Sequence, residues 1–383
     1  MSGFMCIAAA AMAVSVMAVA AVPDERWRTE WPRTDFSKAT VKLEEIQSGG
    51  PPKDGIPAID QPRFVSHREA SRWLDAREPV IVLEHRGEAR AYPLQILMFH
   101  EIVNDTIGGT PAAVTFCPLC NAAIVFERRV DGKVLDFGTT GKLRKSDLVM
   151  YDRQTESWWQ QFTGKAIAGH YAGTTLEPLS STIASFADFR DAHPHGKVLS
   201  RATGYARPYG RNPYRGYDRV GDQPFLFRDP VDPRLPAMER VLGIIKGERV
   251  RVYPLGALKS ESVVNDDLGG EPIAVFSREG MLSALDAERI RDSRKTAAAA
   301  AYSRKVENRT LHFERRETRI VDRETGSEWD LFGRAVAGPL KGRRLKPVDS
   351  GVHFAFAWLA FNPGSEIYGS ARMAPPKAGD RIR

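Results

Sequence analysis

Cysteine is scarce in this chain, which has three cysteines among 383 residues. Cys6 lies in an apolar stretch at the start, so only Cys117 and Cys120 remain if that stretch is removed. So few cysteines exclude a disulfide-rich scaffold, in which several bridges take the place of a large hydrophobic core. The fold must therefore be stabilised by its core, and the single Cys-x-x-Cys pair needs another explanation.

Long apolar runs are also scarce, and only residues 1–20 approach the length that spans a bilayer. This stretch has no charged side chain and ends in Ala18-Val19-Ala20, which is typical of a secretory cleavage site. The usual Lys or Arg before the apolar run is missing, so an uncleaved membrane anchor is the alternative. We predict a signal peptide or anchor at 1–20, then an N-terminal extension at 21–54, in an exported, periplasmic protein.

The charge balance is mildly basic, with a net charge of +7. Such a balance favours contact with anionic surfaces or ligands, but a solvated basic surface is the simpler explanation. No nucleic-acid-binding motif is visible, and export argues against that role. We predict no nucleic-acid partner and membrane association only through an uncleaved N-terminus, and the sequence identifies no protein partner.

The chain contains an internal repeat. Tyr92-Pro93-Leu94 recurs as Tyr253-Pro254-Leu255, at an offset of 161 (253 minus 92). Further matches in the same order are Val103-Asn104-Asp105 with Val264-Asn265-Asp266, Gly108-Gly109 with Gly269-Gly270, Asp152-Arg153 with Asp322-Arg323, and Trp159 with Trp329. The shared order indicates a duplicated domain. The predicted parts are a first repeat at 55–200, a Tyr/Arg-rich linker at 201–235, a second, degenerate repeat at 236–373, and a tail at 374–383.

Each repeat is predicted to consist mostly of short strands. Predicted strands in the first repeat are 80–83, 89–92, 112–116, 123–130, 133–137, 148–151 and 166–168, with helical segments at 93–99 and 183–192. Asp131-Gly132 is a favoured tight turn between two of these strands. The alanine run at 297–301 is predicted to be a loop. The fold class is mainly β, α+β with few short helices, in two tandem barrel- or sandwich-like domains.

The repeat provides an internal control for function. Residues present in both copies are expected to build the fold, whereas residues present in one copy only are free to be functional. At the repeat offset, His100 aligns with Glu261, Glu101 with Ser262, Cys117 with Arg278, and Cys120 with Met281. All four chemically capable residues are missing from the second copy. We therefore predict that the first repeat carries the functional site.

Several stretches resemble a known family. They are GGPPKDGIPAID (49–60), RAYPLQILMFHEIVNDTIGG (90–109), TFCPLCNAAIVFER (115–128), SDLVMYDRQTESWWQQFTGKAIAG (146–169) and YGRNPYRGYD (209–218). Over residues 49–220 the chain resembles the bacterial and archaeal domain-of-unknown-function family 3179. The resemblance implies that the His-Glu pair and the Cys-Pro-Leu-Cys motif are family hallmarks, but it implies no activity.

The favoured hypothesis is a transition-metal site for redox chemistry or metal handling. Cys117 and Cys120 have the spacing of a metal-binding knuckle, and His100 and Glu101 are the natural further ligands. Glu101 is either a fourth ligand or a partner that orients His100. Thiolate and imidazole together suit zinc or copper, and copper is plausible in an exported protein.

Other chemistries remain open. Cys117 and Cys120 could exchange thiol and disulfide, or Cys117 could be a nucleophile with His100 as its base, so these three are also the candidate catalytic residues. The sequence does not establish whether the chain is an enzyme. A further alternative is a binding module, with an inert local disulfide and Trp158 lining a groove.

Overall fold

The computed structural model describes residues 25–259 and 261–369. The predicted leader at 1–20 and the predicted tail at 374–383 lie outside the described residues. Within the described part, no helix is both long and apolar enough to cross a membrane. Strands predominate, and the helices are short, as predicted for a mainly β fold.

Three sheets and a small hairpin build the first repeat. The first sheet has the order β15 (Ser181–Ser185), β3 (Pro79–His85), β4 (Glu88–Pro93), β16 (Lys197–Leu199) and β2 (Phe64–Val65). The second has the order β14 (Pro178–Leu179), β7 (Ala122–Glu127), β6 (Thr110–Cys117) and β5 (Ile102–Ile107). The third has the order β1 (Ile46–Ser48), β10 (Phe137–Arg144), β11 (Asp147–Asp152), β12 (Trp158–Gln160) and β13 (Lys165–Ala168), and the hairpin is β8 (Arg129–Val130) with β9 (Lys133–Val134).

The second repeat has a similar set of sheets. One sheet has the order β28 (Ser350–Phe354), β17 (Arg240–Lys246), β18 (Arg249–Pro254) and β29 (Glu366–Ile367). Another contains β19 (Val263–Leu268), β20 (Glu271–Leu282) and β21 (Lys295–Ser303). The remaining strands are β24 (Phe313–Arg316), β25 (Arg319–Asp322), β26 (Glu328–Trp329) and β27 (Ala335–Ala337), with the hairpin β22 (Lys305–Val306) and β23 (Arg309–Thr310).

The helices are one to two turns long and connect strands. The α-helices are α1 (Glu25–Glu30), α2 (His67–Ala70), α3 (Leu94–Leu97), α4 (Phe186–Ala192), α5 (Leu255–Leu258) and α6 (Ala355–Phe361). The 3₁₀ turns are η1 (Phe36–Lys38), η2 (Leu43–Glu45), η3 (Pro118–Cys120) and η4 (Ile290–Asp292). None of the sheets in the described part closes into a barrel, so the barrel alternative is not observed.

Residues shared by the two repeats make the same contacts in each. Asn104 exchanges two hydrogen bonds with the Phe137 backbone, at 2.8 and 2.9 Å. Asn265 does the same with the Phe313 backbone, at 2.7 and 2.8 Å. Each asparagine thereby ties one strand to the start of a hairpin. These shared residues build the fold, as the internal control predicts.

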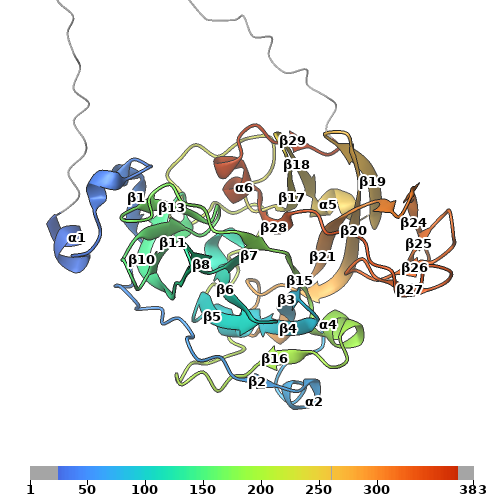
Figure 1. Ribbon diagram of the computed structural model, residues 1–383, viewed down its shortest axis with the longest axis horizontal. Helices are drawn as coiled ribbons and strands as arrows, with labels where there is room; N and C mark the ends of the chain where they lie inside the picture. The colour runs from blue at the N-terminus through green and yellow to red at the C-terminus, as the bar shows by residue number, and fades with distance from the viewer. Residues whose placement is uncertain (1–24, 260, 370–383) are drawn as a thin grey trace, which may run out of the picture.

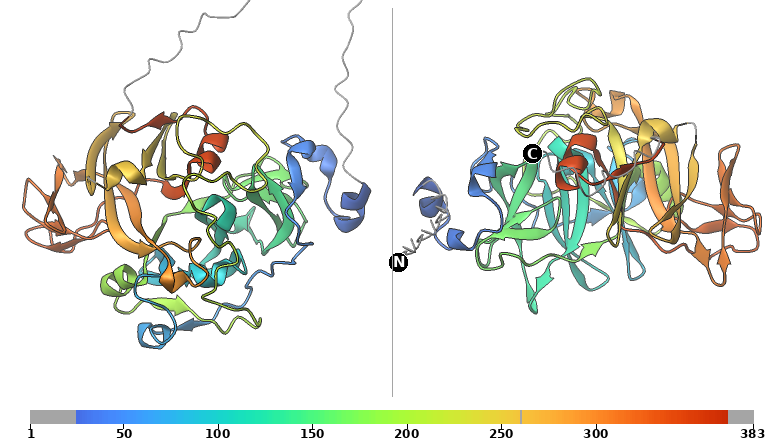
Figure 2. Two further views of the ribbon diagram at one scale, coloured as in Figure 1. Left: turned by 180° about the vertical axis from the view of Figure 1, so that it is seen from behind. Right: turned by 90° about the horizontal axis from the view of Figure 1, so that it is seen from above.

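The repeats lie side by side (Figures 1 and 2), and they share much of their core. The largest cluster of buried apolar side chains includes Val80 and Phe116 of the first repeat and Phe276 and Trp329 of the second. Because this cluster crosses the boundary, the repeats pack as one body. The division into two tandem domains stays a prediction.

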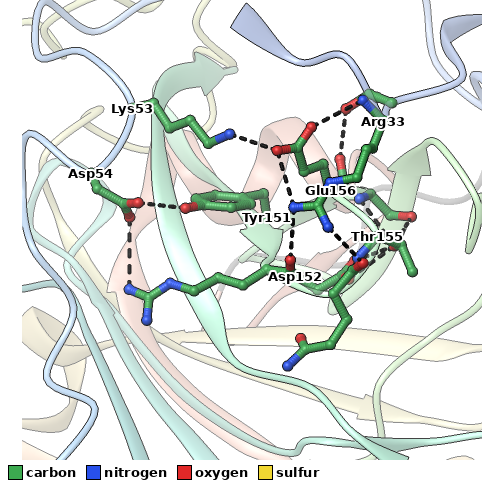
Figure 3. Close-up of polar contacts among 11 residues, drawn as sticks. Arg33, Lys53, Asp54, Tyr151, Asp152, Thr155 and Glu156 are labelled. Atoms are coloured by element: carbon green, nitrogen blue, oxygen red, sulfur yellow. Dashed lines mark hydrogen bonds and ion pairs between the residues drawn. The ribbon is translucent and has the colours of Figure 1, made fainter.

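The N-terminal extension packs on the outer face of the third sheet. Trp31 is fully buried against Tyr151 and Trp158. Polar contacts fasten the same segment, because buried Glu156 accepts hydrogen bonds from the Arg33 backbone and from Lys53 Nζ (Figure 3). The extension is therefore part of the fold. The burial of Trp158 also means that it does not line a groove, and that suggestion was wrong.

Two other local predictions were wrong. The run at 297–301 lies inside β21, where it pairs with β20. Alanine fits there because the strand is buried on both faces, so a lack of large side chains does not break it. The segment 183–192 is helical only from Phe186, because Ile183 pairs with Ile81 in the first sheet and Ser185 caps α4 by accepting a hydrogen bond from the Asp188 backbone.

Candidate functional site

The Cys-Pro-Leu-Cys motif is the tight turn that joins β6 to β7. Cys117 ends β6, and η3 starts with Pro118, whose missing N–H costs nothing at the first position of a helical turn. Asn121 then adopts a left-handed conformation with φ of 49°, which lets the chain reverse into β7. Both thiols point toward the Ser146 carbonyl oxygen, at 3.9 Å from Cys117 Sγ and 3.5 Å from Cys120 Sγ.

Asp147 joins the two cysteines from a different sheet. Lys145 and Ser146 both have positive φ at the tip of the β10–β11 hairpin, and Asp147 is the first residue of β11. The potential ligand atoms of Cys117, Cys120 and Asp147 all lie within 4.8 Å of one another, and all three residues are buried. These spacings are compatible with three ligands around one ion after small adjustments.

Among the described residues, hydrogen bonds reach only one of the two oxygens of the Asp147 carboxylate. Its Oδ2 accepts hydrogen bonds from Gln160 Nε2 at 2.6 Å and from the Phe162 backbone at 2.9 Å. Its Oδ1 is buried and has no hydrogen-bond partner among the described residues. An unpaired buried carboxylate oxygen is costly, so this atom is available to a cation or to a proton.

Glu101 is a further buried acid, near enough for its charge to interact with Asp147 and Cys117 but outside the group whose ligand atoms lie within 4.8 Å of one another. Its backbone has φ of 57°, an unusual conformation for glutamate, and its carbonyl accepts a hydrogen bond from the Phe116 backbone beside Cys117. Its side chain is only 7% exposed. Burial and the nearby charge of Asp147 raise the pKa of Glu101 to about 8.

Burial raises the pKa of each of the three grouped acids, as it does for Glu101. It raises the pKa of Asp147 to about 7, raises the pKa of the Cys117 thiol, and raises the pKa of the Cys120 thiol further. Within residues 25–259 and 261–369, no Lys, Arg or His side chain pairs with any of the four acids. The three grouped acids and the nearby Glu101 are thus buried without a counter-charge among the described residues.

His100 lies apart from this group. Its Nδ1 donates to the Pro57 carbonyl at 2.7 Å, and its Nε2 accepts from the Tyr209 hydroxyl at 2.6 Å. Burial lowers the pKa of His100, which agrees with a neutral ring in this arrangement. His100 could ligate a metal only by giving up one of these bonds, so its role as a ligand stays a prediction.

The Tyr/Arg-rich linker covers the cysteine turn. Tyr217 donates a hydrogen bond to the Leu119 carbonyl at 3.0 Å, and the Phe225 carbonyl accepts one from the Ser146 hydroxyl. Tyr214 lies near Glu101 and Cys117, since burial and then the charges of these two groups raise its pKa. The tyrosines of the linker therefore help to keep water from the site.

Sequence analysis missed Asp147, although a signal for it exists. In the second repeat the β24–β25 hairpin ends with the pair Arg316 and Arg319. In the first repeat the equivalent β10–β11 hairpin continues through a bulge to the pair Arg144 and Asp147. The longer hairpin, like the cysteines, occurs only in the first repeat. Comparison of the two repeats therefore identifies Asp147 as a candidate site residue.

The arrangement favours some chemistries over others. A nucleophilic Cys117 would need His100 as its base, but both nitrogens of His100 are engaged by Pro57 and Tyr209. Thiol–disulfide exchange needs a stabilised thiolate, whereas burial raises the pKa of both thiols here. A bound cation would stabilise both thiolates and Asp147 together, so the residues fit metal binding best.

Comparisons with known proteins give a family and no function. The family model described as protein of unknown function (DUF3179) matches residues 53–365, which extends the resemblance across both repeats. No curated protein and no solved structure matches the chain. Because the match covers most of its length, the chain belongs to the DUF3179 family.

Proposed function

We propose that this chain binds one transition-metal ion through the thiolates of Cys117 and Cys120 and the carboxylate of Asp147. The observation that carries the proposal is the grouping of these three ligand atoms within 4.8 Å in a fully buried position. Two thiolates at the ends of a Cys-x-x-Cys turn and a carboxylate from a neighbouring sheet are a ligand set used in protein metal sites.

Charge explains why a cation suits this position. Buried acids without a counter-charge must remain protonated, and the four acids of this site have no basic partner among the described residues. A divalent ion would balance two of the three negative charges of Cys117, Cys120 and Asp147. If His100 completes the coordination, Glu101 would remain protonated, which avoids a further buried charge.

Zinc fits the ligand set better than copper. Thiolates suit both zinc and copper(I), but a carboxylate is a hard ligand that copper(I) does not favour. Zinc accepts sulfur and oxygen ligands together in tetrahedral geometry. Glu101 or His100 would complete the coordination, and copper remains the alternative ion.

The burial of the proposed ligands favours a permanently bound metal ion over an ion that is passed on to a partner protein. Cys120 and Asp147 have no exposed surface, and the linker lies over the turn. A protein that hands metal to a partner needs its ligands near the surface, so we favour a permanent centre in an exported protein over metal delivery. A redox role would require copper or iron at the site, because zinc does not change oxidation state.

Elemental analysis tests the proposal. The full chain is purified from its native compartment beside Cys117→Ser/Cys120→Ser, Asp147→Asn and Glu317→Gln. Glu317 is an exposed acidic residue in the turn of the shorter β24–β25 hairpin of the second repeat, so it is the control. We expect one equivalent of metal in the wild type and in Glu317→Gln, and loss of metal in the other two variants.

Circular dichroism of each variant separates metal loss from unfolding. Because Asp147→Asn preserves side-chain volume, a folded Asp147→Asn protein without metal supports the site even if the cysteine variant is unstable. A wild-type protein that holds no metal and has Cys117 and Cys120 oxidised to a disulfide contradicts the proposal. That result would favour thiol–disulfide exchange or an inert disulfide instead.

A further inference from the structure

A second candidate site lies between the two repeats. A cavity of about 310 Å³ has one wall from β3 and β15 of the first repeat. Its other wall comes from β21 and from residues 344–350 of the second repeat. None of the four acidic residues of the proposed metal site lines it. The volume is at the lower end of the range for small-molecule sites.

One end of the cavity has an unsatisfied polar group. His193 lines the cavity, is 7% exposed, and has a buried Nε2 without a hydrogen-bond partner among the described residues. The nearest carboxylate oxygen, Glu84 Oε2, is 3.7 Å away, which is too far for a hydrogen bond. A buried ring nitrogen left in this state indicates a partner that the protein itself does not supply.

The lining carries one unbalanced positive charge. Arg344 is ion-paired with Glu84, so these two charges cancel. Arg86 also lines the cavity, and its guanidinium has no hydrogen-bond or ion-pair partner within the part of the chain that the structure describes. Burial, followed by the charge of Arg334, lowers the pKa of His193 to about 4, so His193 is neutral. The cavity therefore suits a ligand with one negative charge.

The rest of the lining is mixed, because hydroxyl side chains line part of the cavity (Ser180, Ser181, Thr182 and Ser350) and apolar or aromatic side chains line another part. The Phe332 ring packs edge-on against His193, with ring centroids 5.5 Å apart. Val82, Ala300 and Leu345 complete the apolar surface. A ligand with a compact apolar or aromatic body could bury that body here and place its charged group near Arg86.

We propose that the cavity between the repeats binds a small organic carboxylate with an aromatic or branched apolar body. The Arg86 guanidinium and the His193 ring nitrogen hold the carboxylate, and the wall around Phe332 holds the body. An Arg–carboxylate pair gives both charge and directional hydrogen bonds, which favours a planar carboxylate. Since both repeats line the cavity, binding also stabilises their packing against each other.

Isothermal titration calorimetry on the full chain tests this proposal, with benzoate as the probe. Benzamide has the same shape without the charge, and phenyl phosphate carries a different anionic group. We expect benzoate to bind, and benzamide to bind about tenfold more weakly or not at all, because the charge-assisted bonds are lost. Equal binding of benzamide overturns the anion assignment, and tighter binding of phenyl phosphate overturns the carboxylate assignment.

Two variants locate the binding site. Arg86→Met and His193→Phe should each weaken benzoate binding by about tenfold. The controls are Arg291→Met and His312→Gln, which change exposed residues that do not line the cavity. Arg86 is exposed, so its replacement should leave the melting temperature unchanged and keep the test valid if His193→Phe is unstable. Absence of benzoate binding at millimolar concentration, or unchanged binding by Arg86→Met, overturns the proposal.

Discussion

Gln160 donates a 2.6 Å hydrogen bond to Asp147 Oδ2, while the other carboxylate oxygen, Oδ1, is buried without a hydrogen-bond partner among the described residues. Both residues are fully buried, and they lie on neighbouring strands β12 and β11 of one sheet. The second repeat has Asp330 at the position that aligns with Gln160. The orienting amide, the oriented carboxylate and the two thiols are therefore all features of the first repeat only.

Gln160→Leu should weaken metal binding without abolishing it. The substitution removes the hydrogen bond that orients Asp147 but leaves the three proposed ligands in place. Loss of such an orienting partner costs about tenfold to a hundredfold in metal affinity. Competition with a chromogenic chelator measures the affinity, and Gln154→Leu, at an exposed glutamine, is the matched control. Unchanged affinity in Gln160→Leu would show that this hydrogen bond does not position Asp147 for the metal.

The two thiols should react slowly in the folded, reduced, metal-free protein. Burial raises the pKa of both Cys117 and Cys120, so less thiolate forms and reagents have little access to it. Each unit of raised pKa means about tenfold less thiolate at neutral pH. A Cys6→Ser background confines the measurement to this pair. We expect two thiols per chain to react with an aromatic disulfide reagent only after unfolding in guanidinium chloride.

Fast reaction of the folded protein would instead support thiol–disulfide exchange. In that case the thiols must become accessible through movement of the linker that covers them. Replacing Tyr217, which donates to the Leu119 carbonyl, by Phe would then raise the reaction rate further. The same replacement should have little effect if the pair is a metal site.

The sequence predicts the parts of the fold that depend on local pattern. The first hairpin, predicted at 80–83 and 89–92, is observed as β3 and β4, and the Asp131-Gly132 turn joins β8 to β9. The continuous apolar run Val80–Leu83, the alternating residues 89–92 and the turn chemistry carry that information. Ala297 to Ala301 was misjudged because burial by neighbouring strands overrides the weak strand preference of alanine.

The site was harder to predict because its residues come from separate elements. Asp147 is 27 residues beyond Cys120 (147 minus 120) and reaches it through the tip of a hairpin in another sheet. His100 and Glu101 are adjacent in sequence, which suggested a joint role. Instead, His100 binds the Pro57 carbonyl and the Tyr209 hydroxyl, while Glu101, whose backbone is left-handed, lies where burial and the charge of Asp147 raise its pKa.

Equivalent aspartates of the two repeats should contribute equally to stability. Asp152 accepts hydrogen bonds from Thr155 and from the Trp159 indole, the latter at 3.0 Å. Asp322 accepts the same bonds from Thr325 and Trp329, the latter at 2.9 Å. Asp152→Asn and Asp322→Asn should each lower the free energy of unfolding by about 1.5–3 kcal/mol, the usual worth of a hydrogen bond to a charged group.

Urea unfolding followed by tryptophan fluorescence measures both effects. A single transition is expected for the wild type and both variants, because one core cluster joins the repeats. Asp322→Asn should also keep the wild-type metal content, since it is far from the proposed ligands in sequence and belongs to the other repeat. Two separate transitions, with only one moved by each variant, would show that the repeats unfold independently.

Buried His353 should make the protein sensitive to acid. Burial lowers its pKa from 6.5 to about 3, and the ring packs between Phe162 and Trp358. Between pH 6.5 and 3 the unfolded chain binds a proton at this residue and the folded chain does not. Acid therefore favours unfolding, and this residue alone should remove about 1.4 kcal/mol of stability for each pH unit below 6.5.

The variant His353→Leu removes the titrating ring and keeps the position apolar. Its free energy of unfolding should fall less steeply than that of the wild type between pH 6.5 and 4, whatever its stability at neutral pH. His312→Gln is the control, since His312 is exposed and pairs with Glu324 on the surface. If the free energy of unfolding falls equally with falling pH in the wild type and in His353→Leu, His353 is protonated in the folded protein. In that case it would need an acidic partner or water at its unpaired Nδ1.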